Sequence, residues 1–197
     1  MKAFCLDLEG VLVPEIWIHV AKKYKLDSLK LTTRDIPNYD HLMKYRIRIL
    51  KKENIQLCNI QKVISTMQPL PGALSFLTAL RKQGPVIILS DTFYEFAGPL
   101  IQKLGYPALF CNWLRVDRQG FIAGYVLRQK DGKKKAVKAL KQVGFQVKAA
   151  GDSYNDLSML REANEAMLFR PPASIAKANS KMPVTKDYST LLKFLCR

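Results

Sequence analysis

Three short apolar runs, each ending in a polar residue and followed by helix-like sequence, constrain the fold of this chain most strongly. The runs cover residues 2–7, 85–90 and 147–152, and they end at Asp7, Ser90 and Asp152. A fourth run, at 166–169, lacks a polar ending. Apolar runs that alternate with amphipathic segments are typical of an α/β fold with a parallel sheet buried on both faces. Such sheets bind ligands beyond the carboxyl ends of their strands, so we expect the polar endings to meet at one site.

Residues 15–69, between the first two runs, are helical in period and too long for a simple crossover. Pro14 with Glu15 suits a helix start, and a second helix is predicted from about Asn38 to Glu53. We therefore predict a catalytic core of residues 1–14 and 70–197, with residues 15–69 inserted over the site as a helical cap. In the core, residues 111–129 alternate around the sequence DRQG and predict a β-hairpin.

Composition bounds the class of protein. A chain of 197 residues with 48% hydrophobic residues can bury one core and carry one insertion. No apolar stretch approaches the length of a membrane span, and the first residues lack the pattern of a signal peptide. The four cysteines have neither disulfide nor metal-site spacing, which favours reduced thiols in the cytosol. We expect a cytoplasmic protein with no membrane partner.

The formal net charge of +16 comes from lysines and arginines spread along the whole chain. Such a charge can steer anionic substrates or attract nucleic acid. We favour a solvated basic surface, because no zinc-finger, RNA-recognition or helix-turn-helix pattern accompanies the charge. A basic nucleic-acid-binding protein remains the remote alternative.

Acidic residues gather at two of the predicted strand ends. Asp152 and Asp156 lie four apart after one strand, and Asp7 with Glu9 follows another, two apart, so that both point the same way in an extended chain. Like charges at one spot are costly to bury unpaired. Because Mg²⁺ prefers a few carboxylates together with water and phosphate oxygens, we predict that it compensates them.

Four segments of the chain resemble the motifs of the haloacid dehalogenase (HAD) superfamily of phosphotransferases, and they follow one another in the order in which that family has them. The matching segments are Asp7-Leu8-Glu9-Gly10-Val11, Ser90, a lysine near 133, and Gly151-Asp152-Ser153-Tyr154-Asn155-Asp156. The resemblance spans nearly the whole chain and implies a HAD-like Rossmannoid core. It also implies phosphoryl transfer through an aspartyl-phosphate.

The resemblance implies a role for each matching residue. Asp7 would be the nucleophile that takes the phosphoryl group. Asp7, Asp152 and the backbone carbonyl of Glu9 would hold Mg²⁺, with Asp156 ligating it or binding its waters. Glu9 would protonate the leaving oxygen and then accept a proton from the incoming nucleophile. Ser90 and the lysine would hold phosphoryl oxygens, although Ser90 alone would equally suit a helix cap.

Helical periodicity selects the lysine from the run at 133–135. Val137, Leu140 and Gly144 lie at +4, +7 and +11 from Lys133, so Lys133 begins the inward stripe. Lys134 and Lys135 are rotated away by about 100° and about 200°.

The same test applied to residues 38–53 distinguishes two arginines. Arg46 lies within an apolar stripe, whereas Arg48 lies on the opposite, polar side. The stripe consists of Tyr39, Leu42, Met43, Ile49 and Leu50. Arg46 is either a paired core residue or a fork for a substrate carboxylate.

Within the superfamily the chain looks most like the phosphoserine phosphatases. Arg46 falls where those enzymes bind the carboxylate of serine, and Glu15 where they bind its ammonium, although Glu15 also suits a helix start for dipole reasons alone. Asn155 would touch the phosphate or the serine moiety, and we count Asp91, beside Ser90, among the substrate-binding residues.

Two departures point to a subgroup. Glu9 replaces the second aspartate of the first motif and reaches outward by about 1.5 Å, and Ser90-Asp91-Thr92 replaces Ser-Gly-Gly. The segments LDLEGVLVPEIW, TTRDIP and ILSDTFYEF are similar to those of bifunctional phosphoserine phosphatase/homoserine phosphotransferases.

This resemblance implies O-phospho-L-serine as donor and water or L-homoserine as acceptor, since one methylene is worth only about 1–3 kcal/mol in discrimination. The alternative is a HAD phosphatase for another small phosphomonoester. A homodimer is left open.

Overall fold

The computed structural model describes residues 1–32, 35–36 and 38–197, and a seven-stranded sheet of order β4-β3-β2-β1-β5-β6-β7 lies at its centre. The strands are β1 (Lys2–Leu6), β2 (Val86–Phe93), β3 (Ala108–Val116), β4 (Ile122–Val126), β5 (Gln146–Gly151), β6 (Glu165–Phe169) and β7 (Val184–Thr185). Neighbouring strands are parallel except for the antiparallel pair β3 and β4. The predicted α/β fold with a parallel sheet and a hairpin is confirmed.

The order of the strands places a crevice at β1. The chain leaves β1 for β2 and β3 on one side and returns to β5, β6 and β7 on the other. Strand order therefore reverses at β1, and a ligand crevice is expected beyond its carboxyl end.

Helices cover both faces of the sheet, because successive side chains of each strand point to opposite faces. Phe4 and Leu6 of β1 pack with the core that includes α4 (Ala73–Arg81) and α9 (Tyr188–Cys196). Cys5, between them, packs on the other side. The helices of that second face are α6 (Gly132–Gln142), α7 (Leu157–Glu162) and α8 (Ala173–Ala178). The strands are therefore apolar on both faces.

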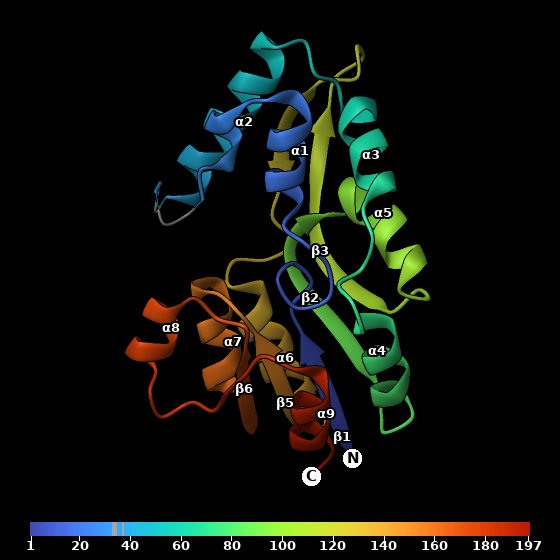
Figure 1. Ribbon diagram of the computed structural model, residues 1–197, viewed down its shortest axis with the longest axis vertical. Coiled ribbons are helices and arrows are strands. Elements are labelled where there is room, and N and C mark those ends of the chain that lie inside the picture. Colours follow the sequence, from blue (N-terminus) through green and yellow to red (C-terminus); the bar gives the residue numbers. More distant parts are fainter. Residues whose placement is uncertain (33–34, 37) are drawn as a thin grey trace.

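Most of the remaining helices lie above the carboxyl ends of β1 and β2, while both termini lie at the opposite end of the molecule (Figure 1). These helices are α1 (Ile16–Tyr24), η1 (Asp27–Lys30), α2 (Tyr39–Lys52), α3 (Leu57–Thr66) and α5 (Tyr94–Lys103). The turn of the β3–β4 hairpin caps α3: the Leu57 amide donates to the Gly120 carbonyl (2.9 Å) and the Gln56 side chain to Gln119 (2.7 Å). The far half of the hairpin thus packs with the inserted helices, and the cap of residues 15–69 stays a prediction.

Helix α2 matches its predicted limits and faces. The Asn38 side chain accepts from the His41 amide (3.0 Å) and so caps the helix. Arg46 is buried in the apolar stripe and Arg48 is exposed. Of the segment TTRDIP, Thr33, Arg34 and Pro37 lie outside the described residues.

Two strand ends differ from the sequence prediction. β1 ends at Leu6, so Asp7 and Glu9 do not lie in an extended strand; the chain turns back instead, with the Leu12 and Val13 amides bonded to the Leu8 carbonyl. β2 continues past Ser90 to Phe93 through an irregular register, because β3 continues alongside it.

The four cysteines are free thiols. In the part of the chain that the structure describes, no helix combines the length and the apolar character that crossing a lipid bilayer requires.

Candidate active site

The polar residues at the strand ends line one cavity of about 240 Å³ at the carboxyl edge of the sheet. Asp7 follows β1, Ser90 lies in β2, Asp152 follows β5, and Lys133 stands in the first turn of α6. Because β1 lies between β2 and β5, these elements bring the four side chains to the same edge.

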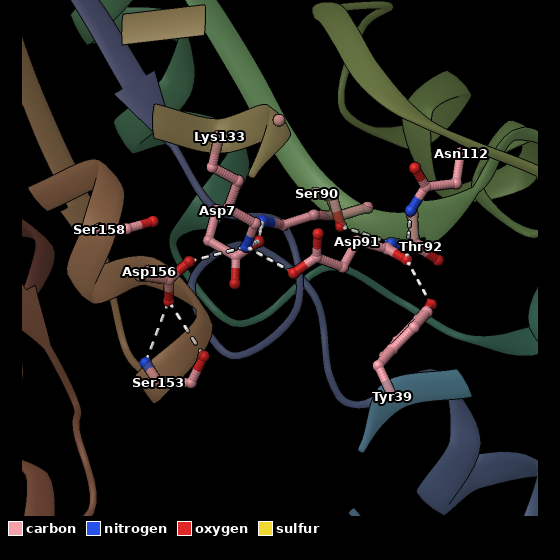
Figure 2. Close-up of polar contacts among 12 residues, drawn as sticks. Asp7, Tyr39, Ser90, Asp91, Thr92, Asn112, Lys133, Ser153, Asp156 and Ser158 are labelled. Atoms are coloured by element: carbon pink, nitrogen blue, oxygen red, sulfur yellow. Dashed lines mark hydrogen bonds and ion pairs between the residues drawn. The ribbon is translucent and has the colours of Figure 1, made fainter. Parts of the chain in front are cut away.

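Lys133 is the centre of the charge network (Figure 2). Its Nζ lies 2.9 Å from Asp7 Oδ1, 2.7 Å from Asp156 Oδ1 and 3.8 Å from Asp91 Oδ2. Burial acts to lower the pKa of Lys133, but Asp156, Asp7 and Asp91 raise that pKa well above its usual value, so the ammonium stays charged. Lys134 is exposed, as the helical period requires.

Asp156 organises the loop after β5. Its Oδ1 is bonded to Lys133, and its Oδ2 accepts from the Asp152 amide (2.9 Å), the Ser153 amide (3.0 Å) and the Ser153 hydroxyl (3.2 Å). A Cβ at position 151 would overlap the Asp156 side chain, so Gly151 permits this close approach. Both oxygens of this fully buried carboxylate are therefore already used by the protein.

The acidic residues fit a divalent cation. Carboxylate oxygens of Asp7, Asp152 and Asp156 lie within 4.8 Å of one another. Burial, and then the charge of Asp156, raise the pKa of Asp7 well above its usual range and that of Asp152 to about 7. The cluster contains three carboxylates and only one ammonium, that of Lys133. Because one positive charge cannot balance three negative ones, the site favours a bound metal ion.

Gly10 lets the two sides of the acidic cluster meet. It has φ +78°, and an added Cβ would overlap the Asp152 carboxylate. Position 10 therefore requires glycine for two reasons, its backbone conformation and the approach of Asp152.

Glu9 is held apart from Asp7, although both line the cavity. Its Oε2 accepts from the Ile16 amide at the start of α1 (2.8 Å). Burial, with repulsion from Glu15, raises the pKa of Glu9 to about 7. A carboxyl group whose pKa is close to neutral can both give and take a proton.

Arg46 lines the same cavity from α2. Its guanidinium carbon lies 4.5 Å from the centre of the Trp17 ring, and its Nη2 donates to the Leu31 carbonyl (2.8 Å). Its Nε is buried and has no hydrogen-bond partner among the described residues. Burial lowers the pKa of Arg46 to about 10, so the side chain remains a cation at neutral pH. An unpaired buried donor is costly unless a ligand completes it.

The remaining candidate residues also line the cavity. Glu15 is exposed at the start of α1, and Asn155 is exposed in the loop after β5. The Asp91 side chain, 45% exposed, projects beside Lys133. The structure thus brings all the candidate residues of the sequence to one site.

Other residues of the site were not identified from the sequence. Tyr39 lines the cavity and donates from its hydroxyl to the Asp91 carbonyl (3.2 Å), which joins α2 to β2 (Figure 2). Asn112, buried in β3, donates to the same carbonyl (3.1 Å). Asn112 could have been noticed in the sequence as a polar residue within an apolar strand. The contact of Tyr39 joins residues 52 positions apart, so no local sequence pattern indicates it.

Comparison with known sequences gives a consistent result. The profile of the haloacid dehalogenase-like hydrolases matches residues 1–164. The phosphoserine phosphatase ThrH of Pseudomonas aeruginosa is 51% identical over 191 residues, 97% of this chain and 93% of that protein. A phosphoserine phosphatase of Pseudomonas syringae pv. tomato is 50% identical over 189 residues, 96% of this chain and 80% of that protein.

Solved structures of the same shape include a phosphoserine phosphatase in apo form and a phospho-aspartyl intermediate analogue of phosphoserine phosphatase. Each superposes with a TM-score of 0.80 at 22% identity and covers 98% of both chains. At this identity the likeness establishes the fold alone.

Proposed function

This chain belongs to the haloacid dehalogenase-like hydrolases, and we propose that it transfers the phosphoryl group of O-phospho-L-serine to water or L-homoserine through Asp7, with Mg²⁺ as cofactor. The 51% identity to a phosphoserine phosphatase ThrH supports the donor. The alternative, another small phosphomonoester, requires the same phosphoryl chemistry and a different partner for Arg46. The free thiols suit a cytoplasmic location.

One observation carries the proposal: a single cavity joins a phosphoryl site to an amino-acid site. Asp7, Ser90 and Lys133 line this cavity together with Arg46 and Glu15. A guanidinium with an unpaired buried Nε suits a carboxylate, and an exposed carboxylate suits an ammonium. Phosphoserine carries the phosphate, the carboxylate and the ammonium that these residues would recognise.

In the first step, an oxygen of the Asp7 carboxylate attacks phosphorus and the bond from phosphorus to the serine oxygen breaks. Glu9, whose pKa is about 7, gives its proton to the leaving oxygen. Ser90 and Lys133 hold the phosphoryl oxygens as their charge redistributes. The products are serine and a phosphorylated Asp7.

In the second step, the oxygen of water or of the homoserine hydroxyl attacks phosphorus, and the bond from phosphorus to Asp7 breaks. The proton of the attacking hydroxyl passes to Glu9, which restores the starting state. Asp7, Asp152 and the backbone carbonyl of Glu9 would hold Mg²⁺, with Asp156 acting through water because both its oxygens are bonded. The ion would neutralise charge on the carboxylates and the phosphoryl oxygens.

The choice between the two acceptors follows from the same cavity. When the inserted helices cover phosphorylated Asp7, bulk water is excluded and a bound amino-acid alcohol competes with it. Arg46 and Glu15 would hold the amino-acid group that serine and homoserine share.

Product analysis tests the proposal. The pure protein is incubated with Mg²⁺, phosphoserine and homoserine, and the products are separated by ³¹P NMR. We expect both phosphate and phosphohomoserine; phosphate alone would remove the transfer to homoserine. In a parallel panel of phosphate esters, a low rank for phosphoserine would favour the alternative substrate class.

A further inference from the structure

A second cavity, of about 290 Å³, opens directly from the phosphoryl site. It shares five lining residues with the first cavity, namely Tyr39, Ser90, Asp91, Lys133 and Asn155. The groups that hold the phosphoryl oxygens therefore face two spaces. One lies under the inserted helices with Arg46, and the other extends along β3 and α6 towards Arg128.

A surface groove continues from this second cavity. The two share Phe110, Arg128 and Gln129, and the groove then follows α6 past Lys135 and Lys138. We call the second cavity and this groove together the lateral channel. Arg128 stands where they join, with its guanidinium carbon 5.1 Å from the centre of the Phe110 ring.

The charge of the lateral channel changes along its length. In the second cavity, Asp91 and Asp131 stand against Arg128 and Lys133, so opposite charges balance. The outer groove is lined by Arg128, Lys135 and Lys138, and none of its described lining residues is acidic. An anion would not be trapped beside the balanced inner part and would be drawn towards the positive outer part.

Hydrogen bonds hold in place the residues that separate the two cavities. Tyr39 lines both of them, and its hydroxyl bonds the Asp91 carbonyl. Asn112 bonds the same carbonyl and accepts from the Arg128 amide (3.0 Å). The amino-acid side of the site and the lateral channel are thus separate spaces that meet at the phosphoryl group.

We infer that inorganic phosphate leaves and enters through the lateral channel, while the amino acids use the first cavity. The inference rests on the phosphorylated Asp7 of the proposed function. Phosphate forms only when water is the acceptor, and a separate anion route would release it without displacing the inserted helices. Transfer between two amino-acid alcohols would not use the route at all.

Oxygen exchange measures this route without phosphoserine. When Asp7 attacks inorganic phosphate, one phosphate oxygen leaves as water, and attack by solvent water on the phosphorylated Asp7 then brings in a new oxygen. Protein with Mg²⁺ and ¹⁸O-labelled phosphate in ordinary water therefore loses label at a rate that includes the passage of phosphate, and ³¹P NMR resolves each labelled species.

The test variant is the double substitution Arg128→Gln and Lys138→Gln. The control is Lys134→Gln, because Lys134 is an exposed lysine of α6, as Lys138 is, but does not line the channel. We expect the double variant to lose label on the order of tenfold more slowly, because two attracting charges are removed. During phosphoserine hydrolysis in ¹⁸O water, its phosphate should carry more than one solvent oxygen, because slow release allows repeated return to phosphorylated Asp7. The control should match the wild type.

A second variant blocks the channel by size: Gln129→Trp should slow exchange without a change of charge, and it replaces the double variant if that one fails to fold. Wild-type exchange rates in both would overturn the lateral route. If the wild-type protein exchanges phosphate oxygen but does not turn over phosphoserine, only the proposed substrate is overturned, and the two variants still test the route. No exchange in the wild type would overturn the phosphorylated Asp7 and the route together.

Discussion

The cavity has two proposed sides that are built differently: a phosphoryl side with Asp7, Asp156 and Lys133, and an amino-acid side with Arg46 and Glu15. On the phosphoryl side, Lys133 contacts three carboxylates and Asp156 accepts four hydrogen bonds, so buried charges are held from several directions. On the amino-acid side, Arg46 Nε has no partner among the residues that the structure describes, and Glu15 is exposed. The first side lies at the edge of the sheet, and the second stands on α1 and α2.

Under the proposed function, this difference would separate chemistry from recognition. A network in which the protein itself holds the buried groups keeps the reacting groups in position for any phosphate ester. An incomplete one gains its missing hydrogen bonds only from a ligand of the right kind, and it therefore selects the substrate. Changes on the phosphoryl side should affect all esters alike, whereas changes on the amino-acid side should affect only those that resemble an amino acid.

The largest effect is expected from Asp7→Asn. The amide has the size of the carboxylate but is a poor nucleophile, so turnover should fall by about 10⁴-fold or more for every ester. Phosphate release from phosphoserine and from an ester without an amino-acid group measures this loss. The control is Asp27→Asn, a change of an exposed acid, and circular dichroism checks the fold. Turnover within tenfold of the wild type would exclude Asp7 as nucleophile.

Gly10→Ala tests how closely the phosphoryl side is packed. The new Cβ would overlap Asp152 at a backbone conformation that alanine disfavours, so Asp152 must move. A displacement of about 1 Å costs about 100-fold in kcat, and we expect this loss for both esters. Gly98→Ala is the matched control, since nothing lies within 4 Å of its new Cβ. Equal activity of the two variants would contradict the close approach.

Arg46→Ala should act selectively. Loss of a buried charge pair costs about 2 kcal/mol or more, so KM for phosphoserine should rise by about 30-fold. For phosphoethanolamine, which has no carboxylate, KM should change by less than about threefold. Arg48→Ala, on the exposed face of the same helix, should leave both values unchanged. An equal rise for both esters would show that Arg46 does not recognise the carboxylate.

The smallest effect is expected from Asn38→Ala, which removes the cap of α2. The loss should be about 1 kcal/mol in the free energy of unfolding. In a chain of this size, that lowers Tm by about 2–4 °C. Differential scanning calorimetry measures it, and His41→Ala, an exposed change in the first turn, is the comparison. A fall in kcat as large as that of Gly10→Ala would mean that α2 also positions the phosphoryl side.

Local sequence patterns were enough to predict which candidate residues lie together. Parallel strands place their carboxyl ends at one edge, so Asp7, Ser90 and Asp152 could be brought together without coordinates. A single helical period sufficed to separate Arg46 from Arg48. The patterns failed where pairing between strands decides the outcome: β2 continues past Ser90 because β3 lies beside it.

The charge of one core residue is misleading when it is read from the sequence alone. Lys148 would be assigned to the surface by its charge, yet it is fully buried in β5, where it pairs with Glu165 (3.0 Å). The Phe194 carbonyl of α9, far along the chain, lies 3.4 Å from the same ammonium and adds a second partner.

The sequence by itself predicted a cluster of acids, a serine and a lysine at the edge of a parallel sheet, and the resemblance of these motifs to the haloacid dehalogenase superfamily implied phosphoryl transfer there. Only the tertiary structure decided that Glu9 turns to the start of α1, that Tyr39 reaches Asp91, and that the phosphoryl site opens into a second cavity. The physical reason is distance along the chain. Periodicity reports which way a side chain faces within its own element, whereas a cavity is formed by side chains from elements that meet only after folding.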